Sequence, residues 1–171
     1  MPDNSPSQSH RDQAPKSVGV AVVTVSDTRT LQDDLGGAVI VQSLDSVGHR
    51  VISRSIVVDQ QELIRTEVAS LLANPQVDAV LLTGGTGLAA RDQTTEAVQE
   101  LLDAEIPGYG ELFRCLSYQE IGPAAMLSRA MAGRVGRKLV FTMPGSPAGV
   151  RLAMDRLIAP ELAHLVLHAG K

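Results

Sequence analysis

The residues best suited to chemistry lie in one short stretch, Thr83–Asp92. Three glycines fall within four positions of it. Because glycine has no Cβ and tolerates positive φ, the backbone N–H groups there can close around an anion. A helical pattern opens just beyond, with Thr94 or Thr95 as the expected N-cap, and a helix N-terminus attracts phosphate. The stretch therefore predicts a phosphate-binding turn, made by Gly84, Gly85, Thr86 and Gly87.

Two known phosphate motifs can be tested against this turn. A Walker A loop is excluded, because no lysine follows the glycines. Residues 85–90 do fit the dinucleotide pattern G-x-G-x-x-A, but that fingerprint also needs an acidic residue about 20 positions on, at the end of the next strand. The candidate, Glu105, lies in a segment that resembles a helix terminus. A tight turn without a ligand is the other alternative, and it would leave Arg91 and Asp92 unexplained.

Three aspartates, like the glycines, lie just beyond predicted strands or the turn that follows one. Asp27 and Asp59 each come directly after an apolar run, and Asp92 follows the glycine turn. Ligands in open parallel sheets bind at the carboxyl ends of the strands, so these groups are expected at one rim. Carboxylates beside a bound phosphate would repel it unless a cation intervened, and Mg²⁺ takes one or two carboxylates together with phosphate oxygens. Asp59 and Asp92 are the predicted metal ligands.

Neighbouring side chains leave alternatives open. Arg91 could neutralise charge on a phosphoryl group during transfer, or form an exposed salt bridge. Ser26 and Asp27 could line the site, or only make a helix cap or an Asx turn.

The elements that must position these residues alternate regularly in the first half of the chain. Apolar runs at 18–25 and 79–82 predict strands buried on both faces of a parallel sheet. A further strand is predicted at 51–58, and a helix is predicted after each of the three strands. This order predicts a doubly wound α/β fold. Further on, a break is expected at 106–110, helices over 111–120 and 124–131, a strand at 138–142, and helices over 148–157 and 161–167.

Composition narrows the class of protein. The chain has 171 residues, and the net charge of −4 without a basic block argues against nucleic acid as a partner. No run is long and apolar enough for a membrane span, and no secretory signal is visible, so a cytoplasmic protein is expected. The polar composition of residues 1–17 predicts a disordered tail, and residues 18–171 are expected to form a single domain. Cys115, the only cysteine, excludes an internal disulfide and is expected to fill space on a helix.

Five motifs in order resemble the MoaB/MogA family of molybdenum cofactor biosynthesis over residues 18–167. The resemblance implies a three-layer αβα sandwich with a mostly parallel sheet, assembled as a homotrimer or as a homohexamer. The motifs are Val25-Ser26-Asp27, Thr83–Gly87 with Arg91-Asp92 and Thr94, Gly108–Glu111, Leu127–Ala130 and Met143–Pro147.

For MogA-like members the family implies an activity, the Mg-ATP-dependent adenylylation of molybdopterin with release of pyrophosphate. Asp59 and Asp92 match the two acidic residues that active members need, whereas some MoaB members lack them. Residues 26–30 and 113–117 are nevertheless more similar to the MoaB branch. The alternative is therefore a catalytically silent protein that binds pterin or docks on a partner, such as another enzyme of cofactor synthesis.

The resemblance also implies a role for each residue at the carboxyl ends of the predicted strands. It implies catalytic and metal-binding roles for Asp59 and Asp92, with Mg²⁺ as cofactor and ATP as co-substrate. A nicotinamide-dependent oxidoreductase stays open as a third function, on the dinucleotide pattern alone. The nucleotide-binding residues are predicted to be Ser26, Asp27, Gly84, Gly85, Thr86, Gly87 and Arg91, and the molybdopterin-binding residues Glu111, Ser117, Ser128, Pro144, Gly145, Ser146 and Pro147.

Overall fold

A six-stranded sheet forms the centre of the protein. The computed structural model describes residues 14–171, so most of the predicted tail, residues 1–13, lies outside the described residues. Strands follow the order β2-β1-β3-β6-β5-β4 across the sheet. Their bounds are β1 Gly19–Val25, β2 Arg50–Val57, β3 Ala79–Thr83, β4 Ala104–Glu105, β5 Ala132–Val135 and β6 Lys138–Met143.

The sheet is mostly parallel, as predicted. β1 pairs in parallel with β2 and β3, and β3 pairs in parallel with β6. β5 runs antiparallel to β6 and to β4, at one edge. No pattern in the sequence indicated β4 and β5, because they have only two and four residues.

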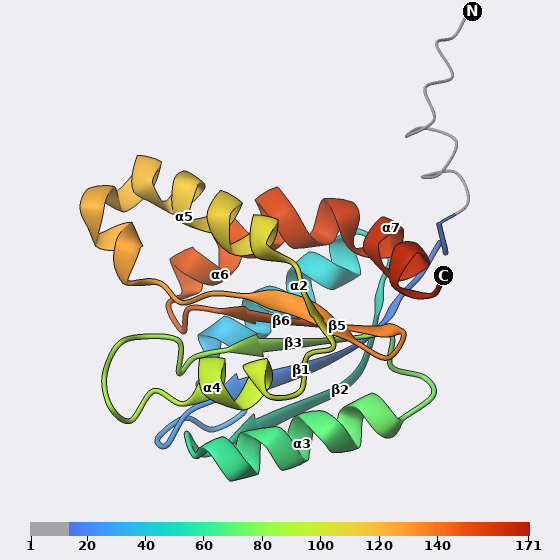
Figure 1. Ribbon diagram of the computed structural model, residues 1–171, viewed down its shortest axis with the longest axis horizontal. Coiled ribbons are helices and arrows are strands. Elements are labelled where there is room, and N and C mark those ends of the chain that lie inside the picture. Colours follow the sequence, from blue (N-terminus) through green and yellow to red (C-terminus); the bar gives the residue numbers. More distant parts are fainter. Residues whose placement is uncertain (1–13) are drawn as a thin grey trace, which may run out of the picture.

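Helices cover both faces of the sheet and confirm the three-layer arrangement. Figure 1 shows α2, α5, α6 and α7 over one face, and α3 and α4 over the other. Within residues 14–171, no helix is both long and apolar enough to cross a membrane. The helix bounds are α2 Leu35–Ser46, α3 Gln61–Ala73, α4 Thr94–Gln99, α5 Pro107–Ile121, α6 Pro147–Ala153 and α7 Ala159–Ala169.

Strand β1 shows why its sequence is apolar at nearly every position. Val20 and Val22 pack into the core cluster with α2 and α5–α7, whereas Ala21 and Val23 pack with α3 and α4. All seven residues of β1 are buried. Because successive side chains of a strand point to opposite faces, a strand covered on both sides needs an unbroken apolar run.

The break predicted at 106–110 is wrong, because helix α5 begins at Pro107 and includes Gly108–Gly110. Proline suits the first turn of a helix, where its missing N–H would have no partner. Tyr109 is buried, donates its hydroxyl to the Thr142 carbonyl at 3.0 Å, and packs edge-on against Phe141. These tertiary contacts outweigh the low helix propensity of the two glycines.

The helix predicted over 124–131 is also wrong. Gly122, at φ 64°, ends α5, and a short 3₁₀ segment, η1, covers Gly122–Leu127. The chain then becomes extended at Ser128 and enters β5. Cys115 is exposed on α5, so it does not fill space as expected.

The two helices predicted near the carboxyl end form one continuous rod. A π-helical turn, Met154–Ile158, joins α6 directly to α7. The interruption predicted between residues 157 and 161 does not occur. The wide π-helical turn just before Pro160 accommodates this residue, which cannot donate a backbone hydrogen bond.

Candidate functional site

The predicted site residues converge where the connections of the sheet change direction. From β1 the chain passes first to β2 on one side, and then to β3 on the other side. Such a switch leaves a crevice outside the carboxyl ends of the strands, which is the usual ligand site of doubly wound sheets. Asp59 follows β2, Asp27 follows β1, the glycine turn follows β3, and Pro144 follows β6.

The glycine turn needs its glycines for space as well as for conformation. Gly84 and Gly85 have φ values of 98° and 65°. A Cβ at Gly84 would lie 2.3 Å from the Val25 carbonyl oxygen, and one at Gly85 would lie 2.2 Å from Oγ1 of Thr94. Any other residue at either position would push β1 or α4 away from the turn.

Only part of the turn is available to an anion. The N–H of Gly84 donates to the Met143 carbonyl at 3.1 Å, so the turn's first amide is already occupied. Among the hydrogen bonds of residues 14–171, none is donated by the amides of Gly85, Thr86 and Gly87. We call these three N–H groups the open amides. They form the part of the predicted phosphate cradle that can still accept a ligand.

Thr94 does not cap the following helix as predicted. The N-cap of α4 is Gln93, without a side-chain cap. Thr94 is fully buried, and its hydroxyl donates to the Gly84 carbonyl at 2.8 Å while its N–H donates to the Gly85 carbonyl. The residue therefore holds the glycine turn against α4.

Three carboxylates and an arginine line a small cavity beside the turn. This acidic hollow has a volume of about 180 Å³ and is lined by Asp27, Asp59, Arg91 and Asp92, together with Gly85. Asp59 accepts a hydrogen bond from the Gln93 N–H at 3.0 Å, and its own N–H donates to Asp27 at 3.0 Å. The structure thus places the two predicted metal ligands in one cavity.

The charges in the acidic hollow are not balanced. Burial, together with the nearby charges of Asp92 and Asp27, raises the pKa of Asp59. The Gln93 N–H and Arg91 only partly oppose this rise. A carboxylate whose ionisation is disfavoured by its neighbours would be relieved by a bound cation.

The donor set fits Mg²⁺ better than a fully caged metal. Within residues 14–171, no three His, Cys, Asp or Glu side chains are grouped so that they could hold a metal. Mg²⁺ needs only one or two carboxylates, because it keeps water and phosphate oxygens as its other ligands. Asp59 and Asp92 would supply the protein's share.

A larger cleft lies on the other side of the glycine turn. It has a volume of about 420 Å³ and lies between the turn, α5, η1 and the start of α6. Its floor and walls include apolar side chains such as Phe113 and Leu152. The predicted residues that line it are Gly84, Gly85, Thr86, Gly87, Asp92, Ser117, Ser128, Pro144, Gly145 and Ser146.

Two residues predicted to bind pterin lie elsewhere. Glu111 lines a separate cavity of about 190 Å³ near Arg114, because it points away from the cleft on α5 while Ser117 points toward it. Six positions along a helix correspond to a rotation of about 240°, so the two side chains cannot share a face. Pro147 lines a third cavity, beside Gly36 and Thr83.

Ser26 forms the local turn that the sequence left open as an alternative. Its hydroxyl accepts from the N–H groups of Thr28 and Arg29 at 3.3 and 3.2 Å. Ser26 nevertheless also lines the acidic hollow. The turn shapes the loop that carries Asp27 past the end of β2.

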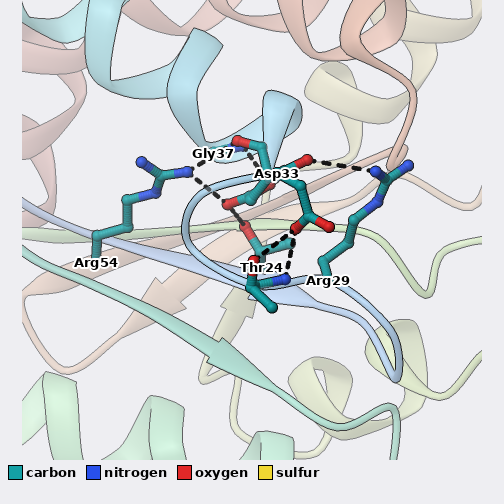
Figure 2. Close-up of polar contacts among 7 residues, drawn as sticks. Thr24, Arg29, Asp33, Gly37 and Arg54 are labelled. Atoms are coloured by element: carbon teal, nitrogen blue, oxygen red, sulfur yellow. Dashed lines mark hydrogen bonds and ion pairs between the residues drawn. The ribbon is translucent and has the colours of Figure 1, made fainter.

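A second buried carboxylate, Asp34, stabilises the wall behind the site. It accepts from the Thr24 hydroxyl at 2.6 Å, from Arg54 at 2.9 Å and from the Gly37 N–H at 2.9 Å, which caps α2. Figure 2 shows Thr24 and Arg54 converging on this turn from β1 and β2. Burial alone would raise the pKa of Asp34, but these three hydrogen bonds outweigh it and lower the pKa below 3.8.

Sequence reasoning missed Arg129 as a functional residue, although the run Leu127–Ala130 carried part of the resemblance. Its side chain donates to the carbonyls of Gly87 and Asp92, at 2.8 and 3.0 Å. The sequence signal was an arginine beside Ser128, but nothing in its spacing indicates a contact 37 residues back along the chain.

Comparisons with known proteins agree with this geometry. A family described as "Probable molybdopterin binding domain" matches residues 21–164. The molybdenum cofactor biosynthesis protein B of Bacillus cereus is 52% identical over 157 residues, which cover 91% of this chain and 93% of the relative.

Solved structures show the same fold. A crystal structure of a molybdenum cofactor biosynthesis protein B has 52% identity and a TM-score of 0.89, covering 92% of this chain and 98% of that one. A structure of MogA has 29% identity and a TM-score of 0.78, covering 88% of this chain and 99% of that one.

Proposed function

The chain belongs to the MoaB/MogA family of molybdenum cofactor biosynthesis proteins, and from this premise we propose that it adenylylates molybdopterin with Mg-ATP and releases pyrophosphate. A role in molybdenum cofactor biosynthesis follows from the family itself. One observation carries the choice of reaction: the open amides adjoin a hollow that is lined by three carboxylates, those of Asp27, Asp59 and Asp92. Backbone amides can bind the phosphate oxygens of a nucleotide, and the neighbouring carboxylates can bind the metal ion that accompanies it.

The chain's own groups have distinct tasks in this reaction. The open amides of Gly85, Thr86 and Gly87 hold phosphate oxygens of ATP, and Arg91 lies where it can neutralise charge on the departing pyrophosphate. Asp59 and Asp92 would hold Mg²⁺, which supplies Lewis-acid charge stabilisation when bound. The terminal phosphate of molybdopterin forms a bond to the α-phosphorus as the bond from that phosphorus to the pyrophosphate oxygen breaks.

The large cleft suits the second substrate. Its wall on α5 and η1 carries apolar side chains such as Phe113 and Ile121, which can cover a flat pterin ring, together with the charged Glu120. Ser117, Ser128 and Ser146 offer hydroxyls to polar groups. Because the cleft and the acidic hollow both include Gly85 and Asp92, the two substrates would meet at the glycine turn.

The test is the variant Asp92→Asn. The shape of the side chain and its bond from the Ala89 N–H at 3.0 Å can be kept, while the metal-binding charge is lost. We expect pyrophosphate release from molybdopterin and Mg-ATP to fall at least about 100-fold, with an unchanged melting temperature. Asp45→Asn, on the exposed surface of α2, is the matched control. Equal turnover in the two variants would exclude the metal role of Asp92.

A silent binding protein is the second candidate, favoured by the greater identity to protein B than to MogA. Such a protein would bind molybdopterin in the large cleft without consuming ATP. Equilibrium binding of molybdopterin, measured with and without Mg-ATP, separates the two candidates. Binding that is indifferent to Mg-ATP, with no pyrophosphate formed, would favour the silent protein.

We also propose that copies of the chain assemble as a trimer or hexamer through α5 and η1. These two elements expose several large apolar side chains, which a monomer would leave in water. Light scattering after gel filtration should report the assembly, and Met126→Glu should weaken it. The exposed side chains are Leu112, Tyr118, Ile121, Met126 and Leu127.

A further inference from the structure

We propose that Arg129 is a positioning residue that holds the loop Thr86–Asp92 in its reactive shape. Arg129 lines neither the large cleft nor the acidic hollow, so its effect is exerted through the loop. The catalytic part of this inference rests on the proposed adenylyl transfer. The structural part rests on the contacts of Arg129 alone.

Three hydrogen bonds from one residue fix the loop. Nε of Arg129 donates to the Gly87 carbonyl at 2.8 Å, Nη2 donates to the Asp92 carbonyl at 3.0 Å, and the backbone N–H donates to the Thr86 carbonyl at 3.3 Å. Within residues 14–171, these are the hydrogen bonds that join those three loop residues to a distant part of the chain. The loop's other bonds are local, such as the one from the Ala89 N–H to Asp92.

The guanidinium is itself held in place. Its Nη1 forms an ion pair with Glu96 on α4, and the Arg129 carbonyl accepts from the Thr95 hydroxyl at 3.4 Å. Burial would raise the pKa of Glu96, but the bond from Arg129 outweighs it and lowers that pKa, so the pair stays charged. The planar fork of arginine reaches three separated acceptors from three different nitrogens, whereas the N–H groups of lysine all leave one nitrogen and cannot span these positions.

The loop needs such a clamp because its composition makes it flexible. Gly87 lowers the cost of alternative backbone conformations, and Leu88–Ala90 are exposed, so the middle of the loop packs against little. Asp92 also passes close to Gly87, where a Cβ would lie 2.6 Å from its carboxylate. Arg129 fixes both ends of this tight arrangement.

The clamp also connects the two proposed substrate sites. Arg129 follows Ser128, which lines the large cleft, and it bonds to Asp92, which lines both cavities. In-line transfer needs the attacking phosphate and the α-phosphorus aligned, and an error near 1 Å costs about 100-fold in rate. Loss of the clamp should therefore reduce turnover more than nucleotide affinity.

The experiment compares Arg129→Gln with the wild-type chain by two measurements. Hydrogen exchange without any ligand should be at least about 10-fold faster in the variant at the amides of Ala89 and Asp92, the hydrogen-bonded N–H groups of the loop. With Mg-ATP and molybdopterin, kcat for pyrophosphate release should fall about 100-fold, while the KM for Mg-ATP changes less than about threefold. Arg129→Lys should restore neither property.

Two further variants make the result decisive. Arg65→Gln removes another arginine that forms ion pairs, with Glu62 and Glu100, but that does not contact the loop, and it should change neither measurement. Glu96→Gln keeps Arg129 and its loop bonds, so it should retain most of the turnover. Wild-type exchange in Arg129→Gln, or the full defect in Glu96→Gln, would overturn the proposal. If the wild-type chain releases no pyrophosphate, the proposed function fails, and the exchange measurement still decides the clamp.

Discussion

Asp34 and Asp59 are aspartates at the same end of the sheet with opposite environments. Asp34 is almost completely buried, but a threonine hydroxyl, an arginine and a helix N–H all stabilise its charge, and its pKa is lowered. Asp59 is half-buried among other carboxylates, and its pKa is raised. The first is surrounded by the partners that an ionised carboxylate needs, whereas the second has one nearby arginine, Arg91, against two neighbouring carboxylates.

This difference separates a structural charge from a functional one. A buried charge with a complete set of partners holds elements together, here β1, β2 and α2. A charge whose neighbours destabilise it lowers the stability of the free protein and gives a ligand something to relieve. Substitution of Asp34 should therefore reduce stability, whereas substitution of Asp59 should reduce the proposed activity.

The largest effect should come from Asp59→Asn. The proposed pyrophosphate release should fall about 100- to 1,000-fold, which is the typical loss when one electrostatic contact to a transition state is removed. The melting temperature at pH 7 should not fall and should rise slightly, because the amide can still accept from the Gln93 N–H while like-charge repulsion is lost. Turnover and thermal melting on one preparation test both parts. A clear drop in melting temperature would make Asp59 structural as well.

Asp34→Ala should have the opposite profile. The variant leaves Arg54 without its partner, frees the Thr24 hydroxyl and removes the α2 cap, so unfolding should become easier by about 3 kcal/mol. Urea unfolding measures this change. Asp33→Ala, one position earlier and exposed, is the control, and it should cost well under half as much. A small loss in Asp34→Ala would contradict the assigned structural role.

Added Mg²⁺ should distinguish the sites by a smaller stabilisation. At a free concentration ten times its dissociation constant, a bound ion stabilises the folded state by about 1.4 kcal/mol. We expect this stabilisation in the wild-type chain and in Asp33→Ala, and its loss in Asp59→Asn. Thermal melting over a magnesium series gives the comparison. An undiminished shift in Asp59→Asn would place the ion elsewhere.

The smallest effect should be in the pH dependence of stability, where the two aspartates act with opposite sign. The contribution of Asp34 is present above its ordinary pKa of 3.8 and is lost as the pH falls through its lower folded value. The contribution of Asp59 is present below 3.8 and is lost as the pH rises through its higher folded value. Urea unfolding from pH 3 to pH 7 measures both contributions. Asp34→Asn should remove only the loss of stability toward low pH, and Asp59→Asn should remove only the loss of stability toward high pH.

The sequence predicted the parallel half of the sheet because local patterns determine it. Strands covered on both faces must be apolar throughout, and this signature is visible at 18–25 and 79–82 without any knowledge of partners. The glycine turn could be predicted for the same reason, since positive φ leaves few alternatives to glycine. The αβα arrangement then follows from the order of the elements.

The remaining features depend on contacts between distant residues. The short strand β5 forms because β6 offers it a partner, and α5 includes Gly108–Gly110 because Tyr109 fits against Phe141. Neither cause lies within the segment itself. The occupied amide of Gly84 and the direction of Glu111 likewise depend on the assembled structure, so the sequence could not predict them.

The exposed thiol of Cys115 gives this chain a built-in reporter. It is the chain's only cysteine, and it lies on α5, the helix whose apolar face we propose to be covered by another copy. A maleimide dye would therefore attach at a single defined place without any engineering. Its fluorescence anisotropy on dilution would follow dissociation of the assembly in real time.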